Sequence, residues 1–123
     1  MMSFTNFVSV DGNLTRDAEI RYSSSGTAFS SFCIAHNRKV KEKDEVSYFD
    51  VTVIGKHAEM ITERLRKGTT VLVVGRLRQQ RWEDDRGGKR SKVDILASQV
   101  MFNGSVPKGT DAAGEIPDED IPF

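Results

Sequence analysis

Cysteine, proline and long hydrophobic runs are scarce in this chain of 123 residues. Its one cysteine, Cys33, excludes an internal disulfide framework and a zinc site built on cysteines. No apolar run approaches the roughly 18–20 residues that a membrane-spanning helix needs. The first residues, MMSFTNFVSVDGN, lack the basic and long apolar segments of a signal peptide. We therefore expect one globular domain with a short appendage, in a reducing, cytoplasmic compartment.

Residue types that commonly carry out catalysis are also few. The two histidines, His36 and His57, form no metal-binding pattern with Cys33, which we interpret as a packing residue. The sequence has no glycine-rich phosphate loop of the Walker or dinucleotide type. It therefore predicts no catalytic residue, no metal site and no cofactor, and we do not expect an enzyme.

The formal net charge of zero conceals two oppositely charged parts. Residues 1–103 contain 17 Lys and Arg against 13 Asp and Glu, a net charge of +4. Residues 104–123 contain one Lys and five acids, a net charge of −4, together with all three prolines. This split predicts a binding domain over 1–103, a flexible linker over 104–117 and a disordered acidic tip over 118–123.

Hydrophobic patterns predict five strands and one helix in the first 103 residues. The expected strands cover 7–14, 28–39, 46–54, 70–83 and 91–102, with a short extended segment at 19–22. Between the third and fourth strands, residues 57–67 have a helical period that stops before Gly68. The charged segments 40–45 and 84–90 are expected to be loops. This order indicates an all-β OB-fold, a five-stranded Greek-key barrel, although other small barrels fit the same pattern.

Four consecutive apolar residues, 71–74, require burial on both faces of their strand. A small barrel buries only its inner face, so the outward pair, Leu72 and Val74 or their neighbours, needs another cover. We favour a subunit interface, and the alternative is cover by the N-terminal residues of the same chain.

Residues 75–82 alternate long cations with other side chains and end in Trp82, the one tryptophan of the chain. On a strand, Arg76 and Arg78 share a face with Trp82, and Arg81 lies close to its rim. Phosphates require positive charge and unpaired bases require a flat ring to stack on, so this track is typical of single-stranded nucleic-acid binding. The alternatives are that Trp82 covers the barrel end and that individual arginines are structural.

Two other segments add candidate contacts. Tyr48 and Phe49 are adjacent on a strand, so one ring enters the core or an interface while the other is free to stack. The cationic segments around 38–43 and 84–90 either close over a bound strand or are ordinary solvated hairpins.

The last six residues place three acids before Ile-Pro-Phe and a carboxylate. A terminal Phe with its carboxylate suits an apolar pocket beside a basic residue on another protein. We expect a partner-binding element made of Asp118, Glu119, Asp120, Ile121, Pro122 and Phe123.

Nearly the whole chain resembles the bacterial single-stranded DNA-binding proteins (SSB). The motifs that carry this resemblance are Gly12-Asn13-Leu14, Gly55-Lys56, Leu65-Arg66-Lys67-Gly68, Gly75-Arg76-Leu77-Arg78, Arg81-Trp82 and the end of the tip, Asp120-Ile121-Pro122-Phe123. The resemblance implies an OB-fold subunit, usually in a homotetramer, that binds and protects single-stranded DNA without sequence preference. It also implies that the tip recruits exonucleases, helicases and clamp-loader subunits during DNA replication, recombination and repair. The implied location is the bacterial cytoplasm, in association with the nucleoid and without a membrane partner.

The resemblance also bears on individual residues. Trp82 matches a stacking aromatic of the family, and Tyr48 stands where tryptophan is frequent. Val40 and Ile54 stand where many members carry further aromatics. The candidate DNA-binding residues are Trp82, Tyr48, Arg76, Arg78, Arg81, Lys56, Lys67, Arg38, Lys39 and Arg86. The competing hypotheses are an RNA-binding barrel of the cold-shock type and an adaptor whose barrel only oligomerises.

Overall fold

The fold is known from a computed structural model that describes residues 4–102. Its elements, in chain order, are β1 (Val8–Leu14), β2 (Glu19–Tyr22), β3 (Ala28–Val40), β4 (Lys43–Ile54), α1 (Lys56–Ile61), the 3-10 turn η1 (Thr62–Arg64), β5 (Thr70–Glu83) and β6 (Lys89–Phe102). Among these residues, no helix has the length and apolarity needed to cross a bilayer. The linker over 104–117 and the tip over 118–123, with their expected flexibility and disorder, lie outside the described residues.

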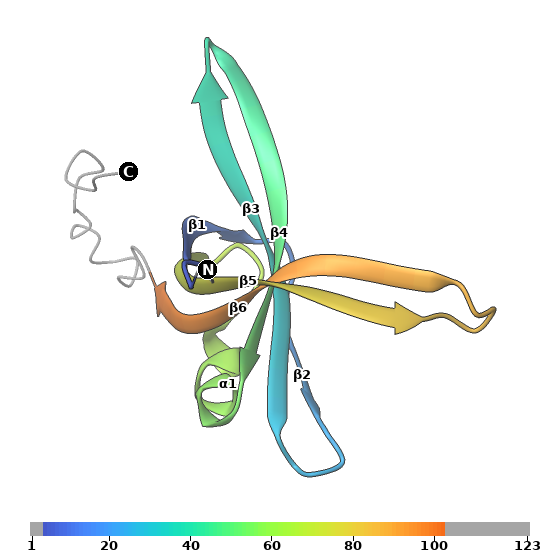
Figure 1. The fold of residues 1–123 in the computed structure, drawn as a ribbon. Coiled ribbons are helices and arrows are strands. Elements are labelled where there is room, and N and C mark those ends of the chain that lie inside the picture. Colours follow the sequence, from blue (N-terminus) through green and yellow to red (C-terminus); the bar gives the residue numbers. More distant parts are fainter. Residues whose placement is uncertain (1–3, 103–123) are drawn as a thin grey trace.

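Five of the strands close into a barrel (Figure 1). They pair in the order β1-β5-β6-β4-β3, and β1 returns to pair with β3 at Asn13 and Leu14. Gly12 permits this closure, because a Cβ at that position would lie 2.6 Å from the carbonyl oxygen of Ala35. The short strand β2 pairs with the first four residues of β3, 28–31. The predicted OB-fold, with five barrel strands and one helix before the fourth of them, is confirmed.

The barrel core follows from side-chain alternation along the strands. On β3, Phe32 and Ile34 are buried, whereas Ser31 before them is exposed and Cys33 between them is only partly buried. Each such buried side chain contributes about 1.5–3 kcal/mol. The buried apolar residues are Leu14, Ala28, Phe32, Ile34, Val51, Val53, Ala58, Ile61, Leu65, Val71, Val73, Ile95 and Val100.

A β-bulge on β6 reverses which side chains face the core. The partner of Gly75 is Ala97 and that of Val74 is Gln99, so β6 uses one extra residue at this point. Ile95 and Val100 are therefore both buried although their positions differ in parity. The bulge also brings two backbones together, because a Cβ on Gly75 would collide with the carbonyl oxygen of Leu96.

Two long hairpins project from the barrel in different directions (Figure 1). We call them the β3–β4 arm, residues 35–48, and the β5–β6 arm, residues 78–94. The prediction of a charged loop over 40–45 is wrong, because β3 extends to Val40 and β4 begins at Lys43. Their connection is a two-residue turn at Lys41 and Glu42, with φ values of 50° and 70°. Such turns usually carry Asn or Gly, so these two residues gave no turn signal. The expected loop at 84–90 is confirmed in slightly shorter form, since β6 begins at Lys89.

The helix is shorter than the expected range of 57–67. It ends at Ile61, and one 3-10 turn follows. Leu65 is fully buried as its helical spacing predicts, but its backbone carbonyl accepts a hydrogen bond from the N–H of Ala18. The N–H of Gly68 likewise donates to the carbonyl of Leu14. These tertiary hydrogen bonds replace the last helical turn.

Candidate nucleic-acid interface

The outer face of β5 presents the predicted cationic track. Register places Arg76 opposite Leu96, Arg78 opposite Asp94 and Trp82 opposite Arg90. Because alternate residues of a strand share a face, these three β5 side chains point to the same side. Arg76 and Trp82 are exposed, and Arg78 is partly buried.

Trp82 lies well out on the β5–β6 arm and is 47% exposed. A hollow of about 410 Å³ adjoins it. The lining residues are Arg81, Trp82, Glu83, Lys89, Arg90 and Ser91. The indole is therefore not sealed inside the barrel, and three cations surround the space beside it. This arrangement offers a flat ring and positive charge within one site.

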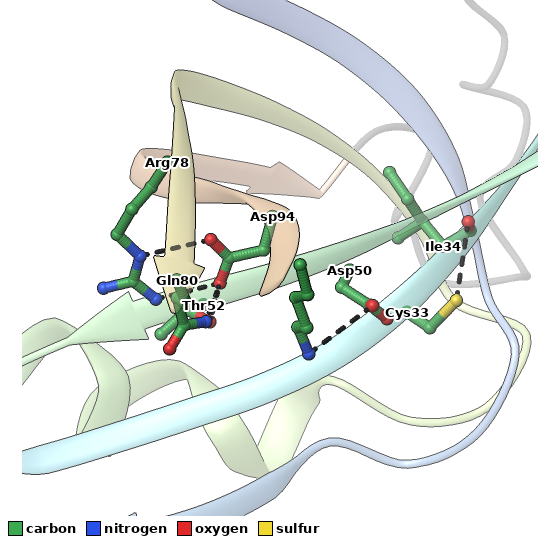
Figure 2. A network of polar contacts seen from close by, with 8 residues as sticks. Cys33, Ile34, Asp50, Thr52, Arg78, Gln80 and Asp94 are labelled. Carbon is green, nitrogen blue, oxygen red and sulfur yellow. Dashed lines mark hydrogen bonds and ion pairs between the residues drawn. The ribbon is translucent and has the colours of Figure 1, made fainter. Parts of the chain in front are cut away.

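Arg78 is engaged by a buried carboxylate (Figure 2). Its Nε donates to Asp94 Oδ1 at 3.1 Å, and a terminal nitrogen donates to Oδ2 at 2.9 Å. Thr52 Oγ1 and Gln80 Nε2 also donate to Oδ2, at 2.8 and 3.1 Å. Burial raises the pKa of Asp94, but the hydrogen bonds from Arg78 and Thr52 and the charges of Arg78 and Lys92 outweigh it and lower the pKa below its ordinary value. Arg78 is thus an arginine with a structural partner, the alternative that the sequence left open.

The other predicted cations have no such partner. Within residues 4–102, none of their side chains forms an ion pair, in contrast to Arg78. They are Arg38, Lys39, Lys56, Lys67, Arg76, Arg81 and Arg86, and all are exposed. Arg81 donates to Gln79 Oε1 at 2.7 Å. Their charges are therefore available to a phosphate backbone.

Tyr48 and Phe49 divide as the sequence predicts. Phe49 packs against the core, and Tyr48, at the base of the β3–β4 arm, is 67% exposed. Tyr48 borders a hollow of about 270 Å³ between β4 and the β5–β6 arm, which Leu77 and Val93 also line. A flat ring thus stands at the base of one arm while Trp82 stands on the other.

The remaining candidates lie at separate places. Arg38 and Lys39 are on the β3–β4 arm, and Arg86 is in the loop that ends the β5–β6 arm. Lys56 begins α1, which packs on β3 and β4 away from the tips of both arms (Figure 1). Lys67 follows η1, and its backbone N–H donates to Asp17 Oδ1 at 2.8 Å.

The loop that carries Arg86 is organised by Asp84. Its carboxylate accepts hydrogen bonds from the backbone N–H groups of Arg86 and Gly88 and from Arg90 Nε. The hydrogen bond from Gly88, followed by those from Arg90 and Arg86, lowers the pKa of Asp84 below its ordinary value. The loop next to Trp82 is thereby held by an ionised carboxylate.

Asp94 is the residue of this site that sequence reasoning missed. The available signal was an acid inside the apolar run Val93–Leu96. A carboxylate in such a run is costly to bury unless another side chain pairs with it, so a partner could have been expected. Within residues 4–102, no cluster of three or more His, Cys, Asp or Glu side chains has the arrangement of a metal site. His36 instead uses its Nδ1 in contact with Asp11, 2.8 Å from the backbone oxygen and 3.2 Å from Oδ1.

Comparison with known proteins points in the same direction. The profile of the single-strand binding protein family matches residues 5–103. The chain is 46% identical over 112 residues to the single-stranded DNA-binding protein of Treponema pallidum, which covers 88% of this chain and 63% of that protein. For the protein of the same name from Helicobacter hepaticus, identity is 41% over 109 residues, with coverage of 85% and 64%. For that of Thermotoga maritima, identity is 36% over 129 residues, with coverage of 98% and 92%.

The lengths of these relatives differ from that of this chain. The chain spans less than two-thirds of the Treponema pallidum and Helicobacter hepaticus proteins, and nearly all of the Thermotoga maritima protein. The family profile, over residues 5–103, covers the barrel that carries both arms.

Proposed function

This chain belongs to the single-strand binding protein family, and on that premise we propose that it binds single-stranded DNA without sequence preference. The observation that carries the proposal is the half-exposed indole of Trp82 among Arg81, Lys89 and Arg90. A ring of this kind stacks on any base, and the cations contact the phosphates. The activity is binding and involves no reaction, in keeping with the family.

We assign the contacts to the predicted residues. Trp82 and Tyr48 provide stacking surfaces, and the exposed cations of the track and arms, led by Arg76 and Arg81, neutralise phosphates. Arg78 contributes charge to the same face while it holds Asp94. Lys56 and Lys67 lie farther away and serve a strand that wraps beyond the arms.

A fluorescence titration tests the proposal. Addition of poly(dT) should quench the fluorescence of Trp82. A plot of the logarithm of the binding constant against the logarithm of the salt concentration should have a slope of about −0.7 for each phosphate contact. An unchanged signal without binding by any method rejects the proposal. Competition between poly(dT) and poly(U) separates it from the RNA-binding hypothesis, since a site whose ligand is DNA should bind poly(dT) at least as tightly as poly(U). Clearly tighter binding of poly(U) would indicate a contact with the 2′-hydroxyl and favour RNA as the ligand.

We further propose that the protein protects single-stranded DNA and takes part in DNA replication, recombination and repair as a nucleoid-associated protein of the bacterial cytoplasm. In these roles the tip, 118–123, recruits other genome-maintenance proteins. The support is its acid-rich sequence with a terminal Ile-Pro-Phe. A chain that lacks residues 116–123 should bind DNA but lose affinity for a purified exonuclease of this class. Loss of DNA binding itself would contradict a docking role.

We also propose assembly into a homotetramer. Leu72 and Val74 on the outer face of β5 are only partly buried within the chain, and Met101, opposite Leu72, is 43% exposed. Apolar side chains on the outside of a barrel gain burial from a second subunit. Native mass measurement should give four chains, and Leu72→Asp should reduce the mass. An unchanged mass for Leu72→Asp would exclude this face as the interface.

A further inference from the structure

The two arms are joined by little backbone. β4 and β6 pair in parallel at only two positions, Val51 with Ile95 and Thr52 with Leu96. Beyond these positions the β3–β4 arm and the β5–β6 arm separate (Figure 1). Two residue pairs alone leave the angle between two long hairpins poorly fixed. Side chains at this junction therefore decide how rigidly the arms are held.

One carboxylate occupies the junction. Asp94 on β6 is 2% exposed and accepts hydrogen bonds from β4 through Thr52 and from β5 through Arg78 and Gln80 (Figure 2). A second, exposed link follows beside it, where Lys92 Nζ lies 3.6 Å from Asp50 Oδ2. Asp94 is thus the point where all three strands of the junction meet.

Asp94 is unsuited to contact DNA itself. Its side chain is covered, four donated hydrogen bonds occupy its two oxygens, and its negative charge repels phosphate. A carboxylate at the centre of a cationic face lowers the affinity for DNA by repulsion, so its presence there calls for a structural role. The geometry of the junction gives it that role.

We propose that Asp94 is a positioning residue, which fixes the angle between the two arms so that one DNA strand contacts Tyr48 and Trp82 together. This inference rests on the proposed DNA binding. Thr52 is the donor that links Asp94 to the arm of Tyr48, and Arg78 with Gln80 links it to the arm of Trp82. Loss of either link frees the arms without removing a stacking ring.

Thr52→Val tests the link most directly, because it removes one donor and leaves every charge and the Arg78–Asp94 pair in place. Thr70→Val is the matched control, since Thr70 Oγ1 donates to Asn13 Oδ1 at 2.6 Å on the other side of β5. Binding is measured with labelled oligo(dT) of about sixteen and about four nucleotides, the upper and lower site sizes of an OB-fold. We expect Thr52→Val to lower the affinity for the long oligonucleotide about fivefold, the factor that corresponds to one lost hydrogen bond. The affinity for the short oligonucleotide should not change. Equal loss for both lengths, or no loss, overturns the proposal.

Asp94→Asn provides a test by sign. The variant removes one negative charge from the binding face, so electrostatics alone predicts tighter binding. Positioning predicts weaker binding to the long oligonucleotide although this repulsive charge is gone. Tighter binding of both lengths would show that Asp94 is only an unfavourable charge.

The arm angle is measured without DNA by pulsed EPR. Spin labels on Asp44→Cys and Asp85→Cys, in a Cys33→Ala background diluted with unlabelled chain, report the distance between the arms. Thr52→Val should broaden the distribution, whereas Thr70→Val should not, and equal widths overturn the proposal. If the unmodified chain binds neither oligonucleotide, the proposed function fails, while these distances still show whether Asp94 holds the arms.

Discussion

At the scale of single residues, the indole of Trp82 is half-exposed and lies beside the cations Arg81, Lys89 and Arg90. Replacing it with Ala removes a stacking surface, and each stacked base contributes about 1–3 kcal/mol. We expect Trp82→Ala to weaken oligo(dT) binding between about fivefold and about a hundredfold. Lys43→Ala, an exposed cation on the other arm, should weaken it less, because it removes one screened charge. Fluorescence anisotropy of a labelled oligonucleotide measures both, and equal losses would remove Trp82 from its proposed role.

The stability of the fold should depend on pH through Asp94, because the pKa of Asp94 is lower in the folded chain than in the unfolded chain. A group of this kind stabilises the fold fully above its unfolded pKa, and the contribution is lost as the pH falls through the folded pKa. Asp94→Asn should therefore lower the free energy of unfolding by about 2 kcal/mol at pH 7, the scale of hydrogen bonds to a charged group. The difference from the unmodified chain should shrink from about pH 5 downward.

Urea unfolding at a series of pH values measures this difference. The lowered pKa values of Asp17 and Asp84 are present in both chains and cancel in the comparison. A difference that is as large at pH 2.5 as at pH 7 would contradict the assignment of the ionised form to Asp94.

At the scale of elements, the β-bulge on β6 depends on a residue without a side chain. A Cβ on Gly75 meets backbone atoms of Leu96 and Ala97, which cannot move aside. We expect Gly75→Ala to destabilise the fold by about 1–3 kcal/mol, as overpacking does. Gly88→Ala is the control, because its Cβ would meet only the Asp84 carboxylate at 3.1 Å. Equal stability of Gly75→Ala and the unmodified chain in urea unfolding would contradict the close approach of the two backbones at the bulge.

Strands and their order were predictable because alternation of apolar residues marks which face of each strand is buried. Phe32 and Ile34 on β3 and Val71 and Val73 on β5 show the pattern plainly. The turn at Lys41 and Glu42 was not predictable, since positive φ values in such residues cost about 1 kcal/mol or more each and leave no compositional signal. The early end of α1 was not predictable either, because hydrogen bonds from distant segments decide it.

The candidate site was predictable as a track but not as a network. A strand period of two places Arg76, Arg78 and Trp82 on one face from sequence alone. Pairing between β5 and β6 is what sets Arg78 opposite Asp94, and pairing between β4 and β6 is what brings Thr52 to the same carboxylate. Which cation is engaged and which is available for phosphate therefore depends on register, a property of the assembled barrel.

At the scale of the whole molecule, charge is divided between a part with a net charge of +4, residues 1–103, and a part with −4, residues 104–123. A covalently attached anionic segment competes with DNA phosphates for the same cations, and this competition is screened by salt. We expect a chain that ends at Asn103 to bind oligo(dT) several times more tightly at low salt. The gain should disappear as the ionic strength approaches about 1 M, where the screening length is about 3 Å.

A matched chain of full length separates charge from length. In it, the five acids Asp111, Glu115, Asp118, Glu119 and Asp120 are replaced by their amides. If charge competition is the cause, this chain should bind as tightly as the truncated one, because both lack the five carboxylates of the side chains. Affinity equal to that of the unmodified chain would mean that the segment acts by its bulk, and weaker binding after truncation would mean that it contacts DNA.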